Sequence, residues 1–416
     1  MTTTAADLRL EDVDLADHDN FVERVPHEMF ALLRREDPVH FQHEPDGPGF
    51  WCITRYDDIA AVHRDWETFS SEIGGTSLQD LTPEQIEARK SMIDMDPPRH
   101  NQLRALVAKG FTPRAVRAYE QKIRELIEGI LDDALPMGEL DFVEHVAAEL
   151  PMRVFAEMLG APQEDRRHLV ELGDKLLGAT DPEFATPEEL EKHRHLPFSS
   201  PVALEMFEYG RGLAAERRAH PRDDIVTKLV QAQIDGEPLT QREFDVYFLL
   251  LATAGNETTR HTISHGLLAL IEHPDQLERL RREPDLHATA AEEMLRWATP
   301  VHHFRRTATK DVQFGGKLIR RGDKVTTWFT SGNRDEDYFP DGDRFDVARA
   351  PNPHLTFGPG GVHFCMGAHL ARLEVRIAFE ALLPRLGAVA LAGSVERLRS
   401  NFFNGIKRLP VRVTPA

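Results

Sequence analysis

The chain has 416 residues, of which 41% are hydrophobic and 29% are charged, so it can form a sizeable core beneath a polar surface. Its formal net charge of −19 argues against nucleic acid and anionic membrane surfaces as partners. Only two cysteines occur, Cys52 and Cys365, so no disulfide framework is expected and a reducing compartment fits. The N-terminus resembles neither a signal peptide nor a membrane anchor, and we expect a cytoplasmic protein.

The first part of the chain combines one strand pattern with a long helical stretch. Residues 49–55 alternate like a strand that buries Cys52, and residues 56–63 have a helical pattern. From about residue 84 to residue 274 the pattern is mostly helical, with interruptions at prolines such as Pro113, Pro162 and Pro221. Short strands are expected at residues 312–314, 324–329 and 409–413. This pattern predicts one predominantly helical domain with a small β portion.

A long central helix is the most distinctive of these elements. Thr240 and Glu243 form a capping box, and the helix can run to about Glu272, roughly 45 Å at 1.5 Å per residue. Its first half is apolar on every side and should be buried, but polar residues then interrupt it at 254–260. Burying a carboxylate and two hydroxyls costs several kcal/mol unless they are satisfied. The polar stretch is therefore either functional, or a satisfied core network, or a place where a threonine bonds back to the preceding turn.

Two pairs of charged residues share helix faces before and after this central helix. His100 and Arg104 lie four positions apart, so their side chains project from the same face. Glu293 and Arg296 lie one turn apart, which permits a bidentate ion pair. Surface helices carry such pairs routinely, so neither pair defines a function alone.

The segment from Phe357 to Gly367 places four glycines around Cys365 and leads directly into a helical pattern at 368–379. A glycine-rich loop can lie flat against a large planar ligand. A cysteine at a helix start meets unpaired N–H donors and the positive end of the helix dipole, which favour the thiolate. These are the requirements for holding haem iron by sulfur. The alternative is a buried structural cysteine beside a glycine-rich turn.

Together these segments resemble the cytochrome P-450 monooxygenases, from about residue 25 to the end of the chain. The resemblance implies a mainly α fold with a small β portion over residues 1–416, in which residues 1–24 form a loosely ordered extension. It implies haem b between the central helix and the cysteine loop, with Cys365 as axial ligand of the iron. Further contacts to the haem are implied for His100, Arg104, Gly255, Arg306, Phe357, Gly358, His363 and Gly367.

The polar stretch of the central helix matches the acid–alcohol pair of this family. The resemblance implies that Glu257 passes protons inward and that Thr258 donates a hydrogen bond during dioxygen reduction. Gly255 would let the helix approach the haem and leave room for dioxygen. Glu293 and Arg296 match a structural charge triad that Arg344, from a later loop, would complete.

The resemblance also implies partners. Because no flavin or iron–sulfur segment follows the haem domain, electrons would come from a ferredoxin and an NAD(P)H-dependent ferredoxin reductase. Candidate docking charges on the cysteine side are Arg114, Arg117, Arg372 and Arg376. A peroxygenase and a haem-binding sensor without turnover are alternative functions, and the presence of Glu257 and Thr258 argues against both.

The spacing of the cysteine loop indicates a branch of the family. Cys365 follows Phe357 by eight positions, where members usually have seven, and residues 254–260 and 400–410 also resemble a bacterial branch. That branch hydroxylates the ends of sterol side chains, methyl-branched lipids and acyclic terpenoids; a terpenoid or steroid ring is the alternative target. The expected substrate pocket is lined by Leu78, Leu250, Ala254, Val301, His302, Phe402 and Phe403. His302 or its neighbour His303 would meet a polar group of the substrate, or else face the propionates or solvent.

Overall fold

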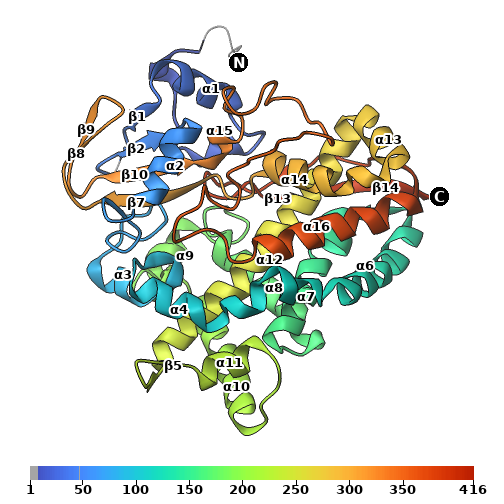
Figure 1. Ribbon diagram of the computed structural model, residues 1–416, viewed down its shortest axis with the longest axis horizontal. Helices are drawn as coiled ribbons and strands as arrows, with labels where there is room; N and C mark the ends of the chain where they lie inside the picture. The colour runs from blue at the N-terminus through green and yellow to red at the C-terminus, as the bar shows by residue number, and fades with distance from the viewer. Residues whose placement is uncertain (1–7, 46) are drawn as a thin grey trace.

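Helices form most of the molecule, and the strands of the main sheet gather at one side of it (Figure 1). The computed structural model describes residues 8–45 and 47–416. The helices before the central one are α1 His27–Glu36, α2 Tyr56–Arg64, α3 Pro83–Arg89, α4 Arg99–Val107, α5 Pro113–Arg117, α6 Glu120–Ala134, α7 Glu149–Leu159, α8 Arg166–Leu177, α9 Pro187–Lys192, α10 Pro201–Ala219 and α11 Ile225–Gln231. This arrangement confirms the predicted mainly α fold with a small β portion.

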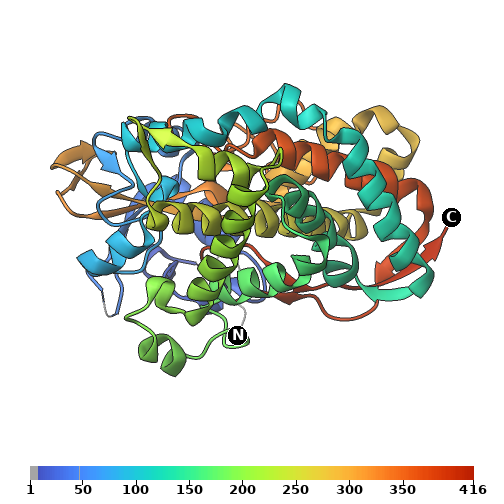
Figure 2. The same ribbon diagram turned by 90° about the horizontal axis from the view of Figure 1, so that it is seen from below.

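The central helix α12 runs over Gln241–Glu272, as the sequence predicts. The Thr240 side chain accepts a hydrogen bond from the Glu243 backbone N–H, and the Glu243 carboxylate accepts one from the Thr240 backbone N–H. Most residues of α12 are buried because α7, α8, α10, α14 and α16 pack around it. Figure 2 shows α10 crossing α12 when the molecule is seen from below. The later helices are α13 Pro274–Arg282, α14 His287–Ala298, α15 Phe329–Gly332 and α16 Ala368–Leu382.

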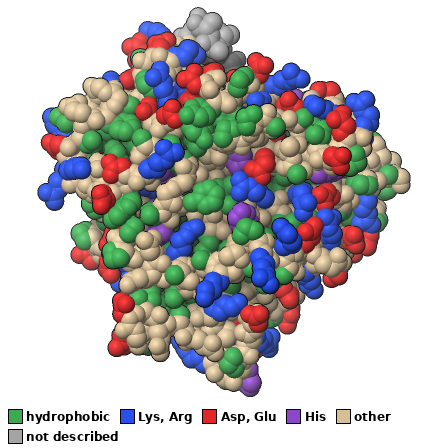
Figure 3. Space-filling model, in the orientation of Figure 1, with side chains coloured by type: hydrophobic (Ala, Val, Ile, Leu, Met, Phe, Trp, Pro, Cys, Tyr) green, Lys and Arg blue, Asp and Glu red, His purple; other side chains and the backbone are tan. Residues whose placement is uncertain are grey.

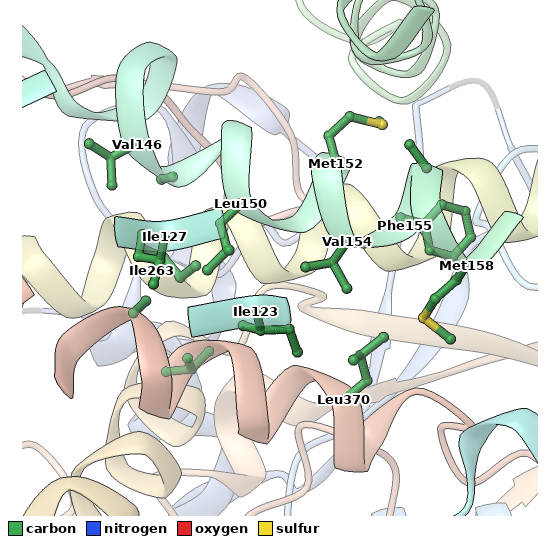
Figure 4. Packing of buried hydrophobic residues seen from close by; sticks show 14 of the residues in the cluster. Ile123, Ile127, Val146, Leu150, Met152, Val154, Phe155, Met158, Ile263 and Leu370 are labelled. Atoms are coloured by element: carbon green, nitrogen blue, oxygen red, sulfur yellow. The ribbon is translucent and has the colours of Figure 1, made fainter. Parts of the chain in front are cut away.

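The largest hydrophobic core lies where α6, α7, α12 and α16 meet (Figure 4). Ile127 of α6, Leu150 of α7 and Ile263 of α12 are at most 1% exposed there, and Leu370 of α16 is 6% exposed. Each such side chain stabilises the fold by about 1.5–3 kcal/mol through burial. This core therefore fixes α16, and with it the cysteine loop, against the central helix.

The main sheet has five strands in the order β1-β2-β10-β7-β3, and only the β2–β10 pair is parallel. The strands are β1 Val39–Gln42, β2 Phe50–Ile53, β3 Phe69–Ser70, β7 His303–Ala308 and β10 Lys324–Trp328. Cys52 is fully buried in β2, as predicted. Strand β10 ends at Trp328, since Phe329 already begins the short helix α15.

The remaining strands form smaller sheets. β11 Leu386–Leu391, β14 Pro410–Pro415 and β4 Glu139–Asp141 make a three-stranded sheet. Two-stranded hairpins are formed by β5 Gln233–Ile234 with β6 Glu237–Pro238, by β8 Val312–Phe314 with β9 Lys317–Ile319, and by β12 Glu396–Arg397 with β13 Ile406–Arg408. The predicted strands at 312–314 and near the C-terminus are thus present. Within the described residues, no helix has the length and apolarity needed to cross a membrane.

The start of the chain differs from the prediction of a loosely ordered extension over residues 1–24. Short 3-10 helices form at Leu10–Asp12 and His18–Phe21. Leu15 is 0% exposed, and the ring of Phe21 stacks at 6.2 Å on Trp328 of β10. The prediction was wrong for residues 8–24 because their apolar side chains cover the sheet, and residues 1–7 lie outside the described part.

Candidate active site

The cysteine loop takes a backbone path that requires glycine. Gly358, Gly360 and Gly361 have φ angles of +83°, +98° and +80°, in the left-handed region that favours glycine. A Cβ atom on Gly361 would lie 2.7 Å from the backbone oxygen of His63, so the loop also packs closely on the end of α2. The N–H of Cys365 donates to the Phe357 carbonyl at 2.9 Å and fixes the cysteine just before α16.

The Cys365 thiol can be reached by solvent although protein surrounds it. Burial raises the pKa of the Cys365 thiol, while the backbone N–H groups of Gly367 and Ala368 act in the opposite direction. The donors predicted at this helix start are therefore present, but burial outweighs their effect on the pKa. A cysteine binds a metal ion as the thiolate, so a metal ion at Cys365 takes the place of the thiol proton.

One stripe of α12 remains accessible in a helix that is otherwise buried. Ala254 is exposed, and Leu250 and Thr258, four positions on either side, are half-exposed. The Thr258 hydroxyl donates to the Ala254 carbonyl at 2.9 Å, so it bonds back to the preceding turn. This is one of the alternatives that the sequence left open, and the hydroxyl oxygen can still accept a hydrogen bond.

The accessible stripe lies near the cysteine loop. A Cβ atom on Gly266 of α12 would come within 2.8 Å of the Phe379 ring of α16, so the two helices touch near their C-terminal ends. Both helices run from the left toward the right in Figure 1. The start of α16 therefore lies beside the middle of α12, where the stripe is.

Gly255 is half-exposed beside Ala254 and also borders α7. A Cβ atom there would lie 3.1 Å from the ring of Phe155 in α7, so the missing side chain makes room for that ring. Ala254 is the most exposed residue of the accessible stripe. The predicted role of Gly255 toward haem and dioxygen stays a prediction, since the accessible stripe and Phe155 border two adjacent small residues.

Three histidines and two arginines gather beside the cysteine loop. The rings of His100 and His363 lie 4.4 Å apart, and Arg306 Nη2 lies 3.4 Å from Nδ1 of His63. Burial, followed by the charges of Arg306, His100 and Arg104, lowers the pKa of His363 to about 2. Burial also lowers the pKa of Arg306 to about 10, so it stays cationic at neutral pH.

These arginines have no carboxylate partner among the residues the structure describes. Arg104 instead donates to the Phe364 carbonyl at 2.8 Å, and Arg306 to the Arg305 carbonyl at 2.8 Å. A buried Arg306 and a half-buried Arg104 without counter-ions are unfavourable unless an anionic group complements them. The two propionates of a haem would supply that charge.

His63 belongs to this cluster, and sequence reasoning missed it. It is 6% exposed, and its Nε2 lies 2.9 Å from the Thr327 hydroxyl of β10. The residue sits in an ordinary amphipathic helix some three hundred positions before Cys365, so no local pattern marks it. Its role becomes visible only when α2, β7 and the cysteine loop come together.

The buried charge triad has a different third member from the one predicted. Arg296 donates to Glu293 through Nε at 2.7 Å and Nη2 at 2.8 Å, with both side chains 0% exposed. Arg349 completes the triad, with its Nε 3.2 Å from the Glu293 carboxylate. The prediction of Arg344 was wrong: its side chain is exposed, and only its backbone carbonyl accepts bonds, from Arg296 and Arg349.

Glu257 is buried on a different side of α12 from Thr258. Its carboxylate forms an ion pair with Arg260, which also pairs with Asp174 of α8 at 2.6 Å, and His261 Nε2 lies 3.6 Å away. Burial raises the pKa of Glu257 to about 8, against the opposing effect of Arg260. These groups line a cavity of about 180 Å³ that also reaches Lys407 and Arg408.

The predicted substrate positions are divided among several surroundings. Leu250 and Ala254 share the accessible stripe, whereas Leu78 packs against the cluster that contains Trp328. Val301 forms a β-bridge with Phe403, which lines the Glu257 cavity. The Phe402 ring lies 5.7 Å from Phe304, a half-buried β7 residue that the sequence analysis did not include.

His302 does not belong to this pocket. It is 1% exposed, its Nδ1 lies 2.7 Å from the Thr330 hydroxyl, and its ring lies 5.0 Å from Phe21. It therefore packs in the core under the N-terminal segment, and the predicted contact with substrate was wrong. The adjacent His303 is 0% exposed, and neither of its ring nitrogens has a hydrogen-bond partner among the described residues.

Three features of the site together fit haem. They are a solvent-accessible thiol on a glycine loop, an accessible stripe of small and apolar residues, and two arginines without a carboxylate partner among the described residues. They supply a sulfur ligand, space beside a flat ring and partners for two propionates. The fold and the site thus define a haem-thiolate protein. The family model of cytochrome P450 matches residues 22–395, and the chain belongs to this family of haem monooxygenases.

Relatives and solved structures agree with this membership. The chain is 39% identical to a steroid C26-monooxygenase of Mycolicibacterium smegmatis, over 97% of this chain and 94% of the relative. It is 41% identical to a methyl-branched lipid omega-hydroxylase of Mycobacterium bovis, over 92% and 90%. A solved structure of Mycobacterium marinum cytochrome P450 CYP268A2 in complex with pseudoionone superposes with a TM-score of 0.85 at 43% identity, covering 92% of this chain and 94% of that one.

Proposed function

We propose that this monooxygenase binds haem b and hydroxylates a terminal or near-terminal methyl group of a branched, largely apolar substrate. The substrate would be a methyl-branched lipid, a sterol side chain or an acyclic terpenoid. The observation that carries the proposal is the accessible Leu250–Ala254–Thr258 stripe in the middle of a buried helix. The names of the relatives, which include a steroid C26-monooxygenase and a methyl-branched lipid omega-hydroxylase, support this substrate class.

The side chains around the stripe have separate roles in the proposed reaction. Haem, when bound through Cys365, supplies the chemistry that activates dioxygen. Leu250 and Ala254 offer an apolar surface beside the Thr258 hydroxyl, which is the only hydroxyl of this stripe. A terminal methyl has stronger C–H bonds than its neighbours, so attack there requires that the pocket position the chain end.

Protons reach this region through Glu257. The cavity beside Glu257 contains several ionic side chains and connects the carboxyl group with Lys407 and Arg408. Burial raises the pKa of the Glu257 carboxyl against the opposing effect of Arg260, so this group takes up a proton more readily than an exposed glutamate. Because Glu257 and Thr258 face different sides of α12, we infer that a rotation of the Glu257 side chain or a bridging water transfers the proton.

Product analysis tests the substrate class. Haem-loaded protein with redox partners would be given a methyl-branched fatty acid, a linear monoterpenoid alcohol and a sterol side-chain ketone. We expect at least one of them to be oxidised at a terminal methyl. Oxidation only at ring or mid-chain carbons would favour ring hydroxylation instead, and no binding of any of the three would refute the proposal.

Replacing Thr258 or Glu257 should uncouple electron consumption from product formation. Thr258→Ala and Glu257→Gln should leave the substrate-induced spin shift nearly unchanged but lower product formation by about a hundredfold, because positioned acid–base groups contribute roughly that much. The measurement is product and peroxide formed per NADH. Thr253→Ala is the matched control, since its hydroxyl also bonds back, to Leu249 at 2.9 Å, but is buried. Normal coupling in both variants would show that no relay passes through these residues.

We further propose that electrons arrive from a ferredoxin that docks beside the start of α16. Arg117, Arg372 and Arg376 line a cavity of about 240 Å³ there. Arg372 already pairs with Glu292 at 2.7 Å and Arg376 with Glu120 at 3.1 Å. The exposed Arg114 and Arg117 have no carboxylate partner among the described residues, so they are better suited than the other two predicted docking residues. Figure 3 shows Lys and Arg side chains over α4 and the start of α16.

Reversing these charges should slow the reaction with an acidic ferredoxin. Arg114→Glu and Arg117→Glu should reduce the association rate by about tenfold at low salt and weaken its dependence on ionic strength. Stopped-flow reduction of the haem protein measures both quantities. Arg218→Glu on α10 is the control, because Arg218 is also exposed and lacks a carboxylate partner within the described part of the chain. An equal effect of all three substitutions would indicate net charge and not a docking site.

A further inference from the structure

Arg89, the last residue of α3, resembles Arg104 and Arg306 in lacking a counter-ion. Its side chain is half-buried, and no carboxylate of the described residues pairs with it. Asp94 is the acid whose charge acts on it, and the Asp94 carboxylate is already bonded by Thr76 at 2.8 Å and Ser91 at 3.0 Å. In a chain with excess acidic residues, a half-buried arginine without a carboxylate partner is an uncommon placement.

Only neutral groups contact the Arg89 guanidinium. Nη1 donates to the Gln79 side-chain oxygen at 2.8 Å, and Nη2 donates to the Ser199 hydroxyl at 3.2 Å. The Phe198 ring lies 5.3 Å from its Cζ, in a cation–π arrangement. Nε is buried and has no partner among the described residues. The guanidinium therefore has an N–H group, at Nε, that none of these neutral neighbours accepts.

The segment on the other side of Arg89 is held in an unusual backbone conformation. Phe198 and Ser199, between α9 and α10, have φ angles of +56° and +52°. Residues other than glycine adopt such angles only where the surrounding structure holds them, and they cluster at ligand-binding segments. Here this conformation presents an aromatic face and a hydroxyl to one guanidinium.

Arg89 lies next to segments that border the candidate substrate region. The Gln79 carbonyl accepts a bond from Arg305 of β7 at 3.1 Å, and the preceding residue of that strand is Phe304, which contacts Phe402. On its other side, α3 is tied to α12 through the ion pair of Glu87 with Arg242 at 2.9 Å. Arg89 is therefore held at the rim between β7 and the first half of α12.

We propose that Arg89 binds the carboxylate of an acidic substrate, at the end of the molecule opposite the methyl group that is hydroxylated. A carboxylate matches the planar guanidinium in a bidentate pair, and it would replace the weaker neutral contacts to Gln79 and Ser199. The substrate would then be a methyl-branched lipid acid or an acid with a sterol-like skeleton. This inference rests on the proposed function, whose substrate class it narrows.

The charge of Arg89 is suited to this role. Burial lowers the pKa of Arg89 to about 10, so the side chain remains cationic at neutral pH but is less stable as an isolated charge than an exposed arginine. A carboxylate that arrives with the substrate relieves that cost, whereas an ester or alcohol does not. The structure thus predicts selectivity for acids over their neutral derivatives.

Spectral titration of the haem-loaded protein with a methyl-branched fatty acid and with its methyl ester tests the proposal. We expect the native protein to bind the acid more tightly. Arg89→Gln should weaken binding of the acid by about tenfold to a hundredfold and leave the ester unchanged, because charged hydrogen bonds contribute that much. Arg89→Lys should retain part of the preference. Arg194→Gln is the control, since Arg194 lies near the same segment but is exposed and pairs with Glu191.

The comparison of acid with ester separates the possible outcomes. Equal weakening of both ligands in Arg89→Gln would show that Arg89 only ties α3 to the 198–199 segment, and this would overturn the proposal. An unchanged affinity for the acid, or a native protein that does not prefer the acid, would overturn it as well. The proposed function would survive each of these results as long as a neutral ligand is still oxidised at a terminal methyl.

Discussion

Cys365→Ser should abolish the far red-shifted Soret band that reduced haem-thiolate proteins show with carbon monoxide. The cysteine is the only thiol beside the accessible stripe of α12, and its N–H is fixed by the Phe357 carbonyl at 2.9 Å. Three glycines with left-handed φ angles give the loop its path, so a serine at the same place keeps the geometry but not the sulfur. The expected effect is complete loss of the band and, with it, of monooxygenase turnover.

The second cysteine provides an internal control for this experiment. Cys52 is 0% exposed in β2, and burial raises the pKa of its thiol to about 12. Cys52→Ala should therefore retain the band, with a modest loss of stability from the smaller core side chain. A red-shifted band that survives in Cys365→Ser, or disappears in Cys52→Ala, would contradict the assignment of the ligand.

How far the sequence predicts the site depends on whether a feature is local. The capping box at Thr240, the length of α12 and the glycine loop are set by neighbouring residues, and the structure agrees with each. The roles of Gly255 and Ala254 depend on which neighbour, Phe155 or the accessible stripe, each residue meets. No motif reports that contact.

Long-range partners were predicted least well. Arg349, not Arg344, reaches Glu293, because the loop between α15 and α16 turns the side chain of Arg344 outward. His63 joins Arg306 only because β7 and α2 pack against the same loop. Such contacts follow from the tertiary packing of segments that are far apart in the chain, so a single sequence does not specify them.

Buried neutral histidines should make the fold sensitive to acid. Away from the arginine cluster, burial is the first cause that lowers the pKa of His27, His261, His265, His302 and His303. For His265 and His302 the pKa falls to about 3. An unfolded histidine titrates near pH 6.5, so below that pH the unfolded chain binds more protons than the native one. Stability is therefore fully present above pH 6.5 and is lost as the pH falls.

Two buried carboxyl groups act with the opposite sign. Burial raises the pKa of both Glu257 and Glu374 to about 8, so the native state holds these protons where the unfolded chain has released them. Their contribution to stability grows as the pH falls toward 4.5 and offsets part of the loss from the histidines. Each group whose proton uptake differs between the native and unfolded states changes the free energy of unfolding by up to about 1.4 kcal/mol per pH unit.

His303 is the residue best suited to test this prediction. Its ring lies 4.5 Å from Trp328 and 5.2 Å from Phe402, and neither ring nitrogen has a partner among the described residues. His303→Phe fits these aromatic neighbours and removes a proton-binding site, so it should reduce the slope by about 1.4 kcal/mol per pH unit without destabilising the protein at pH 7.5. Urea unfolding of the haem-loaded protein between pH 5.5 and 7.5 measures the slope, with His220→Phe as the exposed control. A slope in His303→Phe equal to that of the native protein would mean that His303 is not held neutral by its burial.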